Sequence, residues 1–351
     1  MQFSLSFFSS TGAESSISKY GLLLDAAAFA DRHGFTAIWT PERHFHPFGG
    51  IFPNPSLLGA LLAGRTTQVR IRAGSIVLPL HHPIRITEEW SVVDNLSGGR
   101  VDLGFAVGFH PNDFVLAPDH YHERVRLTFD GIDTVRRLWR GGRYVGPNGR
   151  GEPTSVSIYP APIQEELPVW VTCTGGHSER FVQAGRGGLN VLTALISQSI
   201  DQLAERIREY RAARESAGHD PETGTVTLML HTFLGESLAR VRDLVRAPLK
   251  AYLKSSVELW KQDNTALGKV GEDALEIAFV RYFTTNGLFG TVESCASRVE
   301  DLKKIGVNEI ACLIDFGVAA DVVGPSLEHL NRLRDQCADL LAPCGYASPS
   351  P

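Results

Sequence analysis

The chain has 351 residues, of which 43% are hydrophobic, enough apolar material to bury one large core. Its net charge of -5 argues against a nucleic-acid partner, because duplex binding draws on a dense basic patch. No apolar run approaches the roughly 20 residues of a membrane span, and the first residues lack the features of a signal peptide. We therefore expect a cytoplasmic protein without a membrane or nucleic-acid partner.

Five scattered cysteines without a C-x-x-C pair predict reduced thiols, rather than a disulfide framework or a thiolate zinc site. No linker, charge block or composition break divides the sequence. We therefore expect one domain over residues 1–351.

Short apolar runs typical of buried strands follow one another along the chain, and helical patterns separate them. There are eight such runs, at residues 2–8, 36–40, 70–78, 100–107, 168–174, 189–196, 225–234 and 308–315. Parallel strands need crossover connections, and the intervening segments are long enough to supply them. The alternation predicts an α/β protein built as a single (β/α)8 TIM barrel.

Helical patterns fill most of the connections. They cover residues 19–33, a segment opened by Asn54 and Pro55, and residues 83–96, 123–140, 178–184 and 198–217. The Gly- and Pro-rich stretch 141–161 predicts an irregular excursion. Between the seventh and eighth strands the connection exceeds a normal crossover, which predicts an inserted helical segment over 239–286 that acts as a lid or a docking surface.

The densest polar cluster follows the second strand, where a TIM barrel carries its chemistry. It contains Glu42, Arg43, His44 and His46. His44 is the first candidate for a proton donor or acceptor, since an imidazole does either near neutral pH. Arg43, or Arg72 in the third strand, could hold a negative oxygen or a substrate carboxylate, or pair with Glu42. A plain surface loop is the alternative.

A second alternative for this cluster is a zinc hydrolase. His44 and His46, with His231 and Asp315 near later strand ends, have the residue types of a zinc site. A bridging lysine or a further histidine has no obvious position, and His-x-His alone is a weak signal. We therefore expect no metal.

Two glycine-containing segments are candidates for ligand binding. Gly74 interrupts the bulky third strand, as in a bulge, a tight barrel corner or a surface against a flat ligand. After the fifth strand, Thr174, Gly175, Gly176 and Ser178 open a helix, where bare N–H groups form a cradle for a phosphate or an ordinary turn.

Several stretches in chain order together carry a resemblance to a known family. They are residues 39–46, 72–81, 88–100, 228–233, 288–291 and 310–317. Together they resemble the bacterial luciferase-like, flavin-dependent monooxygenases, and most closely the subgroup found in natural-product biosynthesis. The resemblance implies a barrel that binds reduced FMN at the carboxyl ends of its strands and reacts it with oxygen.

The resemblance also implies roles for individual residues. One segment matches the place where a non-proline cis peptide meets the isoalloxazine ring: Ala73, Gly74 and Ser75. A second matches the strand end beside the flavin: Ala106, Val107 and Gly108. A third matches the phosphate contact: Thr174, Gly175 and Gly176. His44 and Arg43 match the polar groups near the reacting flavin and substrate. True luciferases carry histidine at Arg43 and cysteine at Ala106, so light emission is not expected.

The resemblance further implies partners. Because no nicotinamide motif is visible, we expect a separate flavin reductase. The substrate is expected to be a secondary-metabolite intermediate, either free or tethered to a carrier protein that Lys250, Lys254, Lys261 and Lys269 would meet. We also expect a homodimer. The alternatives are a deazaflavin-dependent oxidoreductase on the same fold and a non-catalytic partner subunit.

Overall fold

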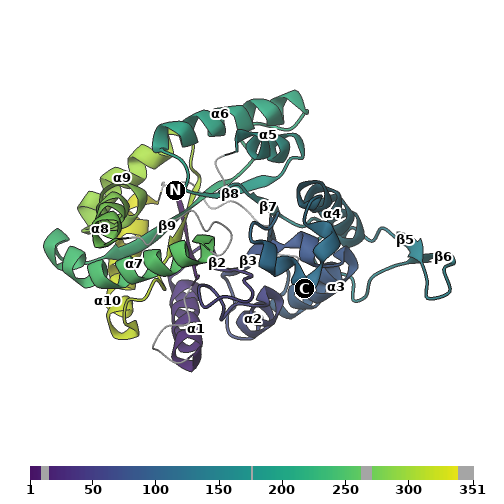
Figure 1. The fold of residues 1–351 in the computed structure, drawn as a ribbon, viewed down its shortest axis with the longest axis horizontal. Coiled ribbons are helices and arrows are strands. Elements are labelled where there is room, and N and C mark those ends of the chain that lie inside the picture. Colours follow the sequence, from purple (N-terminus) through teal and green to yellow (C-terminus); the bar gives the residue numbers. More distant parts are fainter. Residues whose placement is uncertain (9–15, 175–176, 262–270, 339–351) are drawn as a thin grey trace, which may run out of the picture.

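The computed structural model describes residues 1–8, 16–174, 177–261 and 271–338. Eight parallel strands close into a barrel, in the order β1, β2, β3, β4, β7, β8, β9 and β11, with β11 pairing to β1 (Figure 1). Their bounds are Gln2–Ser6, Ala37–Thr40, Arg70–Val77, Val101–Ala106, Val169–Thr172, Asn190–Ala194, Val226–Leu234 and Glu309–Leu313. This confirms the predicted (β/α)8 barrel and all eight predicted strands.

Helices surround the barrel (Figure 1). They are α1 (Ser16–His33), α2 (Pro55–Ala63), α3 (Pro83–Ser97), α4 (Arg124–Trp139), α5 (Ser178–Arg186), α6 (Ile200–Ser216), α9 (Val292–Lys304) and α10 (Ala320–Cys337). The predicted cap of α2 is present, since the Asn54 side chain accepts a hydrogen bond from the Ser56 N–H at 2.8 Å. None of the helices in the described ranges has the length and apolar character needed to cross a membrane.

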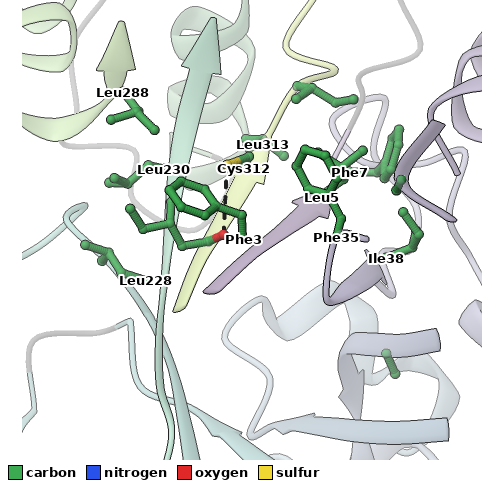
Figure 2. Packing of buried hydrophobic residues seen from close by; sticks show 14 of the residues in the cluster. Phe3, Leu5, Phe7, Phe35, Ile38, Leu228, Leu230, Leu288, Cys312 and Leu313 are labelled. Carbon is green, nitrogen blue, oxygen red and sulfur yellow. Dashed lines mark hydrogen bonds between the residues drawn. The ribbon is translucent and has the colours of Figure 1, made fainter. Parts of the chain in front are cut away.

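The main core lies between the outer face of the barrel and the helices. Successive side chains of a strand point to opposite faces. Phe3 and Leu5 of β1 and Phe7 just after it join this core, as Figure 2 shows, while Ser4 and Ser6 alternate with them. The same apolar layer includes Leu228, Leu230 and Cys312 from β9 and β11 (Figure 2).

Large and charged side chains fill the barrel interior near the amino ends of the strands. The Arg72 guanidinium lies 4.9 Å from the Trp39 ring and 4.4 Å from the Trp170 ring. It donates hydrogen bonds to Asp102 at 2.6 Å and to Glu309 at 2.7 Å. Burial alone would lower the pKa of Arg72, but these two carboxylates outweigh it and raise that pKa. Arg72 is thus part of a closed structural network, which corrects the idea that it holds a substrate oxygen.

Three short strands were not predicted from the sequence. Stretch 141–161 contains an antiparallel hairpin, β5 (Tyr144–Pro147) and β6 (Pro153–Val156), that projects away from the barrel in Figure 1. Its strands are largely exposed, so no hydrophobic alternation marks them in the sequence. The three-residue strand β10 (Leu288–Gly290) pairs in parallel with β9 outside the closed ring.

The predicted inserted segment is helical in its described parts. It forms α7 (Leu238–Lys261), α8 (Glu272–Arg281) and the π-helical turn η4 (Tyr282–Asn286). In α7 the Tyr252 ring lies 4.8 Å from Phe48, in the loop after β2, and 4.9 Å from His231 of β9. The insertion therefore joins the loop after β2 to β9 at the carboxyl end of the barrel.

Candidate active site

The inner face of the barrel is open to solvent near the carboxyl ends of the strands. Gly74, Ala106, Thr172 and Thr174 are only partly buried, although most of the residues beside them in sequence are buried. Met229, in the middle of β9, is also partly buried and packs on the cluster that contains Trp39 and Trp170. Small side chains thus leave space above the layer of Arg72 and the two tryptophans.

A backbone irregularity in β3 forms part of this opening. The peptide bond between Gly74 and Ser75 is cis, and the register with β4 shifts between Ala73 and Ile76. The Ser75 hydroxyl is hydrogen-bonded to the Thr172 hydroxyl across the interior. This is the position where the sequence suggested a bulge and the family resemblance a cis peptide.

Glu42 connects two histidines at the end of β2. Its Oε1 lies 2.8 Å from Nε2 of His44 and 2.6 Å from Nε2 of His81. Its Oε2 accepts the Val77 N–H at 2.8 Å. A carboxylate can only accept hydrogen bonds, so each Nε2 carries its proton and Nδ1 of a neutral His44 keeps a lone pair.

The pKa values agree with an ionised Glu42. Burial alone would raise the pKa of Glu42, but the hydrogen bonds from His44, His81 and Val77 outweigh it, and that pKa is lowered. Burial opposes the charge of His81, yet its hydrogen bond to Glu42 and the charges of Glu42 and Glu89 raise its pKa. The cluster is therefore a buried anion with a histidinium partner at mildly acidic pH.

Arg43 pairs with Asp113, whereas a pair with Glu42 was considered from the sequence. It forms a buried ion pair with Asp113, in the turn η2 (Pro111–Leu116), and its guanidinium lies 5.5 Å from the Phe109 ring. Burial raises the pKa of Asp113, and the charges of Arg43 and His110 act against this rise. The ion pair fixes the loop after β2 to the loop after β4.

The chain leaves β4 through a turn that requires glycine. Gly108 has φ +74°, and a Cβ there would lie 2.9 Å from both Phe114 and Val77. Of the three predicted residues, Ala106 faces the opening, whereas Val107 and Gly108 are buried in the turn beside it.

The start of α5 has features of an anion site. The capping residue before it, His177, makes no side-chain cap hydrogen bond, which leaves the first N–H groups of the helix to other partners. Arg180 is in the first turn, and burial together with the nearby charge of Arg124 lowers its pKa. Thr174 is partly buried at the end of β7, and the predicted Gly175 and Gly176 lie outside the described residues. Arg180 at an uncapped helix start, with Arg124 of α4 near enough for the two charges to interact, favours a phosphate.

An aromatic wall lies around His231 on β9. Its ring centroid is 4.9 Å from Tyr252, 5.2 Å from Tyr282 and 5.7 Å from Phe316, and each ring meets it edge to face. Burial lowers the pKa of His231 to about 3, so the imidazole is neutral. This histidine was considered only as a zinc ligand in the sequence.

The geometry does not support the zinc alternative. Among the described residues, no three His, Cys, Asp or Glu side chains gather in an arrangement that could hold a metal ion. His44 is bonded to Glu42, and Nδ1 of His46 accepts the Phe48 N–H at 3.0 Å within its own loop. Asp315 accepts the Phe8 N–H at 2.8 Å.

Residues 1–309 match the family model described as luciferase-like monooxygenase. The chain belongs to this family. A relative in Acinetobacter baylyi, the oxygenase component of flavin-dependent trigonelline monooxygenase, is 27% identical over 326 residues, covering 89% of this chain and 88% of the relative.

Solved structures of other monooxygenases have the same fold. Monooxygenase RslO1 from Streptomyces bottropensis has a TM-score of 0.74 at 25% identity, covering 94% of this chain and 98% of that chain. The oxygenating constituent of 3,6-diketocamphane monooxygenase from Pseudomonas putida, in complex with FMN, has a TM-score of 0.78 at 17% identity. The match covers 95% of this chain and 96% of that chain.

Within this luciferase-like monooxygenase, sequence reasoning missed three features of the site. It did not assign Glu42 and His81 a joint role with His44, nor Arg124 and Arg180 a role at the helix start. The aromatic neighbours of His231 were also missed. Only the position of His81 shortly after the third strand could have signalled a place at the mouth, because the other contacts join segments far apart in sequence.

Proposed function

We propose that this protein uses reduced FMN and oxygen to add one oxygen atom to a secondary-metabolite intermediate. Family membership supports a monooxygenase. The observation that carries the proposal is the open inner face at Gly74, Ala106 and Thr172, with the Glu42 cluster at one strand end and Arg124 of α4 with Arg180 of α5 at another.

The described residues fit FMN. Arg124, Arg180 and Thr174 would hold the phosphate, because two guanidinium groups and free helix N–H groups match a dianion. Gly74, Ser75 and Ala106 would lie against the flat ring, since their small side chains leave the inner face open. When bound, reduced FMN supplies the electrons that activate oxygen.

His44 is the proposed proton donor and acceptor. Glu42 holds the proton on Nε2, which leaves Nδ1 as the basic atom, and the carboxylate stabilises the imidazolium after Nδ1 takes a proton. Arg43, whose charge is balanced by Asp113, acts by fixing the loop that carries His44. The insertion excludes water from the mouth through Tyr252.

A separate flavin reductase is proposed to deliver the reduced cofactor. The proposed homodimer would cover exposed leucine and valine side chains on two adjacent helices, Leu57 and Leu61 of α2 and Val92 and Leu96 of α3. A two-fold axis would bring this face against the same face of a second copy. In a sedimentation experiment, Leu57→Glu combined with Leu96→Glu should give monomers, and an unchanged dimer would place the contact elsewhere.

The proposed carrier-protein partner has less support. Lys250 is bonded to Glu272 at 2.7 Å and lies 3.5 Å from Glu276, so its charge is already balanced within the chain. Lys254 is exposed, whereas the side chain of Lys261 and the whole of Lys269 lie outside the described residues. Faster turnover of a carrier-bound acyl group than of the same free acid would support this partner, and equal rates would remove it.

The proposed reaction is tested with labelled oxygen. The protein is loaded anaerobically with reduced FMN and mixed with ¹⁸O₂ and candidate substrates, both free and carrier-bound. A product that gains one labelled atom supports the monooxygenase. Oxidation of substrate without label, and only with a deazaflavin, would support the deazaflavin alternative instead.

A further inference from the structure

The proposed cofactor site occupies only one side of the barrel mouth, which is the opening at the carboxyl ends of the strands. Its residues lie on β3 and β4, just after β7, on α4 and at the start of α5. In the closed order of eight strands, β9 lies opposite β3. The wall formed by β9 and the insertion therefore faces the cofactor side across the mouth.

His231 on this wall is buried, and one of its ring nitrogens is unsatisfied by the part of the chain that the structure describes. Only 9% of the residue is exposed, and within the described chain its Nε2 has no hydrogen-bond partner. Leaving a buried polar atom unpaired is costly, and a hydrophobic residue would avoid the cost. Such groups are typical of sites where a ligand supplies the missing partner.

The surroundings of His231 determine what such a ligand can be. Burial and the negative charge of Asp315 raise the pKa of Tyr252 well above its ordinary value, and burial raises that of Tyr282. Both phenols are therefore neutral, as is the imidazole. Aromatic rings attract another flat ring, and neutral N–H and O–H groups pair with a hydroxyl or carbonyl oxygen. A substrate carboxylate is disfavoured here, because it would lose its hydration and lie near the negative charge of Asp315.

We propose that His231, Tyr252 and Tyr282 bind the substrate, which is an uncharged aromatic ring carrying a hydroxyl or carbonyl group. This proposal rests on the proposed function, because that function puts the cofactor on the opposite wall. The ring lies among the aromatic side chains, and its oxygen hydrogen-bonds to the imidazole of His231. The two tyrosines come from α7 and η4, so the insertion that excludes water also selects the substrate.

The test measures binding, with no need for turnover. Calorimetric titration of the protein with 2-naphthol, 2-naphthoate and N-methylquinolinium compares an uncharged, an anionic and a cationic flat probe. We expect 2-naphthol to bind most tightly and His231→Phe to weaken it roughly tenfold, the usual loss for one hydrogen bond. Tyr159→Phe, at an exposed tyrosine, is the control and should change nothing.

The melting temperature of His231→Phe and the affinity for reduced FMN distinguish the possible outcomes of this titration. His231→Phe should melt no lower than the parent protein, because the ring is kept and the unpaired atom is removed. A lower melting temperature with unchanged naphthol affinity would show a purely structural histidine and overturn the proposal, as would tighter binding of either charged probe. Tyr282→Phe gives the same comparison if His231→Phe does not fold. Reduced FMN is titrated separately, so a protein that binds naphthol but not FMN would reject the proposed function alone.

Discussion

The replacement Glu42→Gln tests the role of the buried carboxylate at the end of β2. The amide oxygen can still accept the Val77 N–H, but its NH₂ group faces Nε2 of His44 and of His81, which now donate to the carboxylate. Hydrogen bonds to a charged group contribute about 1.5–3 kcal/mol each. Because the two histidines are not fully buried, we take the lower figure for both and expect a loss of about 3 kcal/mol in the free energy of unfolding.

This loss should depend on pH. The pKa of Glu42 is lowered from 4.5, so its contribution is present above pH 4.5 and is lost as the pH falls through the folded value. The pKa of His81 is raised from 6.5, so its contribution is complete below pH 6.5 and is lost as the pH rises through the folded value. The difference between parent and variant should therefore be largest between pH 4.5 and 6.5.

Urea unfolding at several pH values measures the difference directly. The exposed ion pair of Glu123 with Arg126 provides a control, since Glu123→Gln should change stability by less than about 0.5 kcal/mol. A Glu42→Gln variant as stable as the parent at about pH 6 would refute the expected role of the carboxylate. A loss that stays the same from about pH 6 to about pH 9 would show that the positive charge of His81 takes no part.

Three further predictions concern catalysis, backbone and cofactor. His44→Ala should keep flavin affinity but slow product formation by roughly 100-fold or more, and equal turnover would remove His44 from the mechanism. Gly108→Ala should lower the free energy of unfolding by about 2–4 kcal/mol. In Gly98→Ala, at φ +69°, the added Cβ would meet no atom within 4 Å, so the free energy of unfolding should fall by only about 1–2 kcal/mol. Arg180→Met should weaken FMN binding by roughly tenfold while Arg186→Met does not, and equal effects would place the phosphate elsewhere.

The strands could be predicted from the sequence because each is short, apolar and bounded by polar or glycine residues. The break at Gly74 could also be located, because a glycine between bulky strand residues typically marks a bulge or a close approach of a ligand to the backbone. The position of a side chain along the barrel axis was harder to predict from the sequence. Arg72 alternates onto the inner face, but only the parallel register with Asp102 and the ion pair with Glu309 place it in the amino-terminal half.

The polar contacts of the site could not be predicted, because the fold brings together residues that are distant in the chain. Arg43 and Asp113 come from loops after different strands. Arg124 and Arg180 lie on separate helices, and in sequence each resembles an ordinary surface arginine. The sequence identified the loops that contribute polar residues to the candidate site, and the closed barrel determined the partners within them.

Anaerobic titration with reduced FMN, compared with reduced deazaflavin, tests the central claim most directly, since it needs no knowledge of the substrate. The account predicts tighter binding of reduced FMN, and the same titration on Arg180→Met should show that preference reduced. Tighter binding of the deazaflavin, or no binding of either cofactor, would contradict a flavin monooxygenase site at this barrel mouth.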